Sequence, residues 1–117
     1  MASKTALLLS WCAKIAGEFG VEVKDWTYSW KSGLAWATLI AKFHPEAIDL
    51  KTLQLQNSPL ATMNHVFQVA ESLGVSRLLD AEDMMMEKPE PLSIITYTSL
   101  FYNAFNKVFG WTTDRYV

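Results

Sequence analysis

Apolar residues recur at helical spacing in four long segments of this chain. The segments extend over residues 3–19, 32–43, 58–73 and 91–109. Within each, apolar side chains three and four positions apart fall on one face of an α-helix, which is typical of helices that pack around a shared core. The pattern predicts an all-α fold with four principal helices and short connecting helical turns.

The ends of these segments carry helix-boundary signals. Ser32 is the expected N-cap of the second helix, because its hydroxyl can accept hydrogen bonds from the first free N–H groups. Pro59 lies in the first turn of the third helix and Gly74 follows its end, as the asymmetry of helix termini favours. Residues 80–85 predict one further helical turn, with Asp80 as its N-cap.

The fourth segment is apolar around most of its circumference, so we expect it to be the central, most buried helix. Gly33 has no side chain, so another backbone or a ring such as Trp30 can approach closely there. Residues 21–28 alternate weakly, but no second strand pattern exists to pair with them, so a loop is expected. The residues expected in the core include Trp11, Trp30, Gly33, Leu39, Phe67, Tyr97 and Phe101.

Composition narrows the class of protein. Of 117 residues, 50% are hydrophobic and 13% aromatic, which predicts one ordered domain over residues 3–109 and a tail over 110–117. The net charge is −2 and the ten Lys and Arg residues are scattered, which argues against a nucleic-acid binder. Cys12 is the sole cysteine, and no signal peptide or membrane-spanning run is evident. We therefore expect a cytoplasmic protein.

The sequence offers little chemistry for catalysis. His44 and His65 are far apart, and neither they nor Cys12 form a metal-binding or triad-like spacing. We expect His44 to interact with the last carbonyls of its helix, and Cys12, on an apolar face without a neighbouring cation, to be an inert buried thiol. No enzyme activity, cofactor or metal is predicted.

An acidic cluster lies near residue 80. Asp80, Glu82 and Asp83 lack the alternating ligands, central glycine and terminal glutamate of a calcium-binding EF-hand loop. The expected role of these carboxylates is capping of a short helical turn, or pairing with Arg77 or Lys88.

Several short motifs occur together in one order. They are Leu8–Cys12, Ser29–Ile40, Phe43–Glu46, Val69–Glu71, Leu79–Met84 and Thr96–Tyr97. With these motifs the chain resembles a calponin-homology domain over residues 4–109. The motifs near residues 8, 30 and 79 also resemble the second, or type 2, domain of the tandem actin-binding regions of alpha-actinin and spectrin.

The resemblance implies a non-catalytic interaction module of the actin cytoskeleton. In such tandems the second domain binds F-actin weakly, through its first helix, and regulates its neighbour. Here that helix offers Lys4, Leu7, Ser10 and Lys14 as contact candidates. An ordinary solvated helix face would carry the same residue types. The implied partners are F-actin, an actin-associated protein, or a neighbouring calponin-homology domain in the parent chain.

The resemblance also implies phosphoinositide binding near the second principal helix. Lys24, Lys31 and Lys42 are the candidates there. Each lysine near an anionic membrane contributes only about 1 kcal/mol, so three scattered lysines predict weak lipid contact at most.

Two further uses of the family remain as alternatives. A single calponin-homology domain of a signalling adaptor or exchange factor binds a protein partner and not actin. A microtubule-binding domain relies on basic surfaces, which the net charge of −2 disfavours.

Overall fold

The computed structural model describes residues 3–106. Its helices are α1 (Lys4–Glu18), η1 (Tyr28–Trp30), α2 (Leu34–Phe43), α3 (Leu50–Gln56), α4 (Pro59–Ser72), α5 (Ala81–Met84) and α6 (Pro91–Phe105). No strand occurs within this described range, and the predicted all-α fold class is confirmed. The last three positions of the fourth predicted helix, 107–109, and the tail predicted over 110–117 lie outside the described residues.

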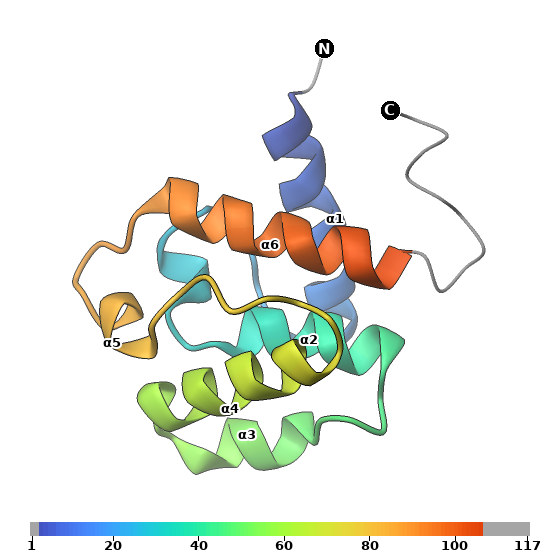
Figure 1. Cartoon of the computed structure of the whole chain (residues 1–117), viewed down its shortest axis with the longest axis vertical. Coiled ribbons are helices and arrows are strands. Elements are labelled where there is room, and N and C mark those ends of the chain that lie inside the picture. Colours follow the sequence, from blue (N-terminus) through green and yellow to red (C-terminus); the bar gives the residue numbers. More distant parts are fainter. Residues whose placement is uncertain (1–2, 107–117) are drawn as a thin grey trace.

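The central helix is α2, and the expectation that the fourth principal helix would be central is wrong. Residues 35–40 of α2 are all buried, and α2 contacts α1, η1, α3, α4 and α6. Figure 1 shows α2 between α6 and the pair formed by α3 and α4. In contrast, α6 buries one face and leaves Leu92 66% exposed. Residues 34–41 hold only one polar residue, Thr38, which agrees with the central position of α2.

A continuous set of aromatic rings joins the helices. Trp36 of α2 lies 4.9 Å from Trp30 and 5.3 Å from Tyr97 of α6, measured between ring centroids. Most of the predicted core residues are fully buried, namely Trp30, Leu39, Phe67, Tyr97 and Phe101. Offset and edge-to-face ring pairs of this kind add to the free energy gained by burial.

Trp11 lies at the edge of this core, where the sequence predicted an interior position. Its ring stacks on Phe43 at a centroid distance of 6.0 Å and meets Tyr102 edge-on at 5.0 Å, while the residue stays partly exposed. The buried positions of α1 are Cys12, Ile15 and Ala16. Trp11 therefore covers the junction of α1, α2 and α6.

The start of α2 depends on Gly33 and not on the predicted Ser32 cap. Gly33 is the N-cap, in the left-handed conformation with φ of 80°, and the Ser32 hydroxyl accepts only from the amide of Leu34 at 3.2 Å. A Cβ on Gly33 would lie 3.3 Å from Sδ and 3.4 Å from Cα of Met63. The close approach predicted at Gly33 is thus made by the side chain and backbone of Met63 in α4, not by the Trp30 ring.

The loop before η1 is built around Asp25. Its carboxylate accepts hydrogen bonds from the amides of Thr27 and Ser29, at 2.9 and 3.0 Å, and its carbonyl accepts from the indole of Trp30 at 2.8 Å. Burial of the carboxyl opposes ionisation, but the hydrogen bonds from Ser29 and Thr27 outweigh it, so the pKa of Asp25 lies below its ordinary value of 3.8. Asp25 thereby orients Trp30 toward the core.

Two short helices complete the fold. The sequence patterns did not single out α3, whose N-cap Asp49 accepts from the amide and hydroxyl of Thr52 at 3.3 and 2.7 Å. The turn predicted near residue 80 is α5. Asp80 is its N-cap residue by position, but its side chain makes no capping hydrogen bond.

Candidate partner-binding surface

The outward face of α1 is the candidate surface for binding a partner. Lys4, Leu7, Ser10 and Lys14 are all exposed, and Leu7 shows 60% of its surface to solvent. Figure 1 shows the N-terminal part of α1 extending beyond α6, so none of the other described helices covers it there. The structure therefore presents all the predicted actin-contact candidates on one side of one helix.

Capping fixes the first turn of this helix. The hydroxyl of Ser3 accepts a hydrogen bond from the amide of Ala6 at 3.1 Å and lies 3.0 Å from the hydroxyl of Thr5. On the opposite side, Cys12 and Ile15 are buried against the core. The buried side holds the helix against the core, and its outer face is not covered by any segment within residues 3–106.

This outer face is locally basic although the chain is acidic overall. Lys4 and Lys14 are the charged residues of α1 before Glu18, and neither forms an ion pair within residues 3–106. Lys4 stands in the first turn, where the helix dipole disfavours a positive charge by about 0.3–1 kcal/mol. A lysine at that position does not stabilise the helix, and its charge remains available to an acidic partner.

The three phosphoinositide candidates each have another partner. Lys24 pairs with Glu22 at 3.3 Å, and both side chains are well exposed. Lys31 donates to the carbonyl of Glu87 at 3.2 Å.

Lys42 pairs with Glu18 at 2.8 Å, which ties the end of α2 to the end of α1. Two of the three charges are therefore offset by a neighbouring carboxylate. An anionic headgroup would compete with these carboxylates, which weakens the case for lipid contact.

The residues considered for catalysis lie apart. Burial raises the pKa of the Cys12 thiol from 9.0 to about 12, so it is protonated and unreactive at neutral pH. The ring of His44 lies edge-on to Phe105, and its Nδ1 is 3.5 Å from the carboxylate of Glu46. The expectation that His44 would interact with helix carbonyls is therefore wrong for its side chain.

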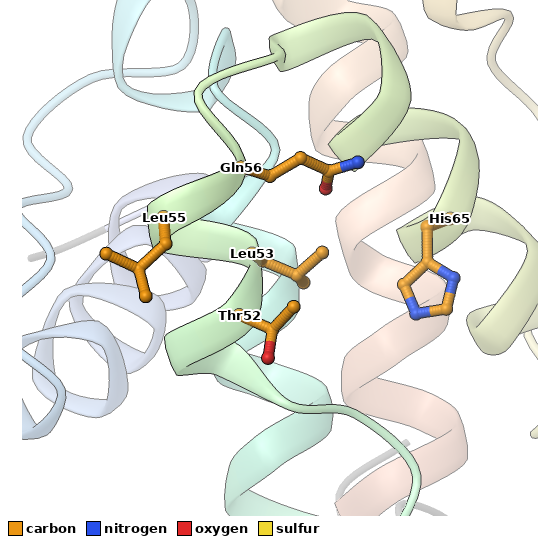
Figure 2. Close-up of a pocket in the computed structure, with 5 residues that line it drawn as sticks. All are labelled: Thr52, Leu53, Leu55, Gln56 and His65. Carbon is orange, nitrogen blue, oxygen red and sulfur yellow. The ribbon is translucent and has the colours of Figure 1, made fainter.

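His65 faces a shallow groove of ≈ 490 Å³ between α3 and α4. Figure 2 shows its imidazole opposite Thr52 and Leu53, with Gln56 at one end of the groove. No carboxylate or thiol lines this groove beside it. In the described part of the chain, no group of three or more His, Cys, Asp or Glu residues is arranged to hold a metal ion.

The acidic residues at the start of α5 form no ion pair with any other described residue. Arg77 instead donates to Asn64 at 2.9 Å and to the carbonyl of Leu79 at 3.3 Å, with its guanidinium 5.3 Å from the centroid of the Phe67 ring. The predicted pairing of the acidic residues with Arg77 or Lys88 is absent between residues 3 and 106.

Sequence patterns missed a second groove, which we call the α6 groove. It is lined by Leu78, Glu90, Leu92, Ser93 and Thr96 and has a volume of ≈ 270 Å³. Leu78 belongs to no periodic stripe. The loop that contains Leu78 lies close to the first turns of α6. This is a contact between segments distant in sequence, so no local sequence pattern predicted the groove.

Among the helices described, none combines the length and hydropathy that a bilayer span requires. What the fold defines is a small helical domain whose exposed features are helix faces and shallow grooves. The family model for the calponin homology (CH) domain matches residues 2–107. The chain belongs to the calponin homology domain family.

Similar proteins agree with this assignment. The chain is 43% identical over 108 residues to the spectrin beta chain of Drosophila melanogaster, and 46% identical over 108 residues to the erythrocytic spectrin beta chain of Mus musculus. It is 39% identical over 109 residues to microtubule-actin cross-linking factor 1 of Rattus norvegicus. These matches cover 91–92% of this chain but only 2–5% of the relatives' length, so the chain corresponds to one small part of each.

Proposed function

We propose that this domain is a non-catalytic interaction module of the actin cytoskeleton, which binds F-actin weakly through the outward face of α1. The observation that carries the proposal is Leu7, 60% exposed on a helix whose unpaired charges are Lys4 and Lys14. Support also comes from the relatives, one of which is named as a cross-linking factor of microtubules and actin.

The size of the surface explains why binding by this domain alone is weak. Covering a leucine side chain contributes about 1.5–3 kcal/mol at full burial. Each exposed ion pair made by Lys4 or Lys14 contributes about 0.2–1 kcal/mol. Association costs about 4–15 kcal/mol in lost freedom, so these contacts need a larger binding region beside them. We therefore propose that this domain has an auxiliary role in F-actin binding.

Such a region fits the resemblance to type 2 domains. We propose that the domain works beside a neighbouring calponin-homology domain in its parent protein, in the cytoplasm and on the cytoskeleton. The neighbour would supply most of the affinity for F-actin, and the α1 face would add to it. The length of the relatives, of which this chain covers 2–5%, leaves room for such a neighbour.

Cosedimentation of the purified domain with F-actin across a salt series tests this proposal. We expect weak, saturable binding at low salt that falls as salt rises, because exposed charges are screened within about 10 Å at 0.1 M salt. Absence of binding at low salt would overturn autonomous actin binding. That result would favour the adaptor alternative, in which the domain binds another protein.

A further inference from the structure

The α6 groove combines exposed leucines with negative charge. Leu78 and Leu92 line it and are 50% and 66% exposed, respectively. Glu90 lines it as well. Large aliphatic side chains with this much exposed surface, gathered around a concave site, are typical of contact surfaces.

The polar groups of the groove are already engaged with one another. The hydroxyl of Thr96 donates to the carbonyl of Leu92 at 2.9 Å, and the hydroxyl of Ser93 donates to Glu90 at 3.3 Å. What the groove offers a ligand is therefore apolar surface and a carboxylate. Its ≈ 270 Å³ is below the roughly 300–1,000 Å³ typical of small-molecule sites, which favours a protein side chain as occupant.

The surroundings of the groove are acidic. Between residues 78 and 92 there are five carboxylates and one lysine, Lys88, and none of these charges forms an ion pair within residues 3–106. The guanidinium of Arg77, next to Leu78, is held by Asn64 and by a backbone carbonyl. Lys31 also reaches this segment, where it donates to the carbonyl of Glu87. Five carboxylates thus stand against the three cations Lys31, Arg77 and Lys88, so the surroundings of the groove keep a net negative charge.

We propose that the α6 groove binds a segment of a partner protein in which a leucine- or methionine-sized side chain stands beside lysine or arginine. The apolar side chain packs between Leu78 and Leu92, and the cation pairs with Glu90. Charge complementarity selects this occupant, since an acidic segment would be repelled and an uncharged one would leave Glu90 unpaired. The groove is separate from the α1 face, so the proposal does not rest on actin binding.

A fluorescein-labelled synthetic peptide with the pattern Lys-Leu-x-x-Leu-Lys tests the proposal by fluorescence anisotropy. The matched control peptide replaces both lysines with glutamate. We expect saturable binding of the lysine peptide that weakens with salt, and no binding of the glutamate peptide. Absence of lysine-peptide binding, or equal binding of both peptides, would overturn the proposal.

Variants of the domain locate the binding site. We expect Leu92→Ser to raise the dissociation constant of the lysine peptide about tenfold, equivalent to 1.4 kcal/mol of lost contact. Glu90→Gln should weaken binding and reduce its salt dependence. Leu55→Ser, at a leucine 79% exposed outside the α6 groove, and Leu7→Ser, on the α1 face, should leave the affinity unchanged.

Two results would contradict the assigned site and occupant. Equal losses for Leu92→Ser and Leu55→Ser would show that the peptide binds any exposed leucine. Light scattering that shows concentration-dependent self-association, removed by Leu92→Ser, would show that a second copy of the chain fills the groove. Loss of actin cosedimentation with peptide binding intact would bear on the α1 face alone, so failures of the two proposals can be told apart.

Discussion

The indole N–H of Trp36 donates a hydrogen bond to the hydroxyl of Thr98 at 2.9 Å, and both residues are fully buried. This bond joins the central helix α2 to α6 in the middle of an otherwise aromatic interface. Because the indole N–H has no access to water, its satisfaction depends on the Thr98 hydroxyl.

Thr98→Val tests the contribution of this bond to stability. Valine keeps the shape of threonine but removes the acceptor, so we expect the free energy of unfolding to fall by about 1–3 kcal/mol. Thr98→Ser retains the hydroxyl and loses one methyl group, which costs about 0.8 kcal/mol. Chemical denaturation measures both. A valine variant as stable as the serine variant would show that the bond contributes little.

Gly33→Ala tests the close approach of α4 to the start of α2. We expect alanine to lower the free energy of unfolding by about 1–2 kcal/mol through the left-handed conformation and by about 1–3 kcal/mol through crowding against Met63. Gly74 has φ of 97° and no atom close to where a Cβ would lie. Gly74→Ala should therefore lose only the part of the stability that comes from the left-handed backbone conformation. Thermal and chemical unfolding should place the Gly33 variant clearly lower. Equal losses would mean that Met63 moves aside freely.

Tyr97→Phe should stabilise the domain. The phenol oxygen of Tyr97 is buried and has no hydrogen-bond partner among residues 3–106. Removing an unsatisfied buried hydroxyl should raise the free energy of unfolding by about 1 kcal/mol. Tyr102→Phe, at a partly exposed ring, serves as the control and should stay within about 0.5 kcal/mol of the parent protein. A loss of stability in Tyr97→Phe would reveal a partner for the hydroxyl.

Alkaline pH should destabilise the domain, first through Cys12. Burial raises the pKa of this thiol from 9.0 to about 12, so above pH 9.0 the unfolded chain releases a proton that the folded chain keeps. The free energy of unfolding then falls by up to about 1.4 kcal/mol per pH unit until the pH reaches the folded pKa. Denaturation between pH 9 and 10 should show this slope. Cys12→Ala should flatten it, and an unchanged slope would contradict the assignment to Cys12.

Much of the fold could be predicted from hydrophobic periodicity. The long helices are where the spacing of apolar residues placed them, because α1, α4 and α6 each bury one broad face and α2 is buried all round over residues 35–40. The central position of α2 was missed because the interpretation followed the wide apolar stripe of residues 91–109, although residues 34–41 of α2 hold only one polar residue, Thr38. The seven-residue helix α3 is too short for a periodic signal, and its local cap at Asp49 is the main cue.

Of the two candidate surfaces, the α1 face could be predicted from the sequence and the α6 groove could not. The exposure of Lys4, Leu7, Ser10 and Lys14 follows from the pattern of α1, because its buried residues leave one arc free. The α6 groove depends on where the loop before α5 meets α6. Such contacts between distant segments have no local sequence signature, and the contacts of Lys31 with Glu87 and of His44 with Phe105 were missed for the same reason.

The central claim is that the α1 face contacts F-actin, and cosedimentation of a charge-reversed domain tests it most directly. We expect Lys4→Glu combined with Lys14→Glu to weaken binding about 5- to 30-fold, the effect of losing 1–2 kcal/mol. Lys51→Glu combined with Lys88→Glu, at two exposed lysines outside α1, gives the same net charge and should bind much more tightly than the α1 double variant. Equal binding by the two variants would contradict the assignment of the contact to α1.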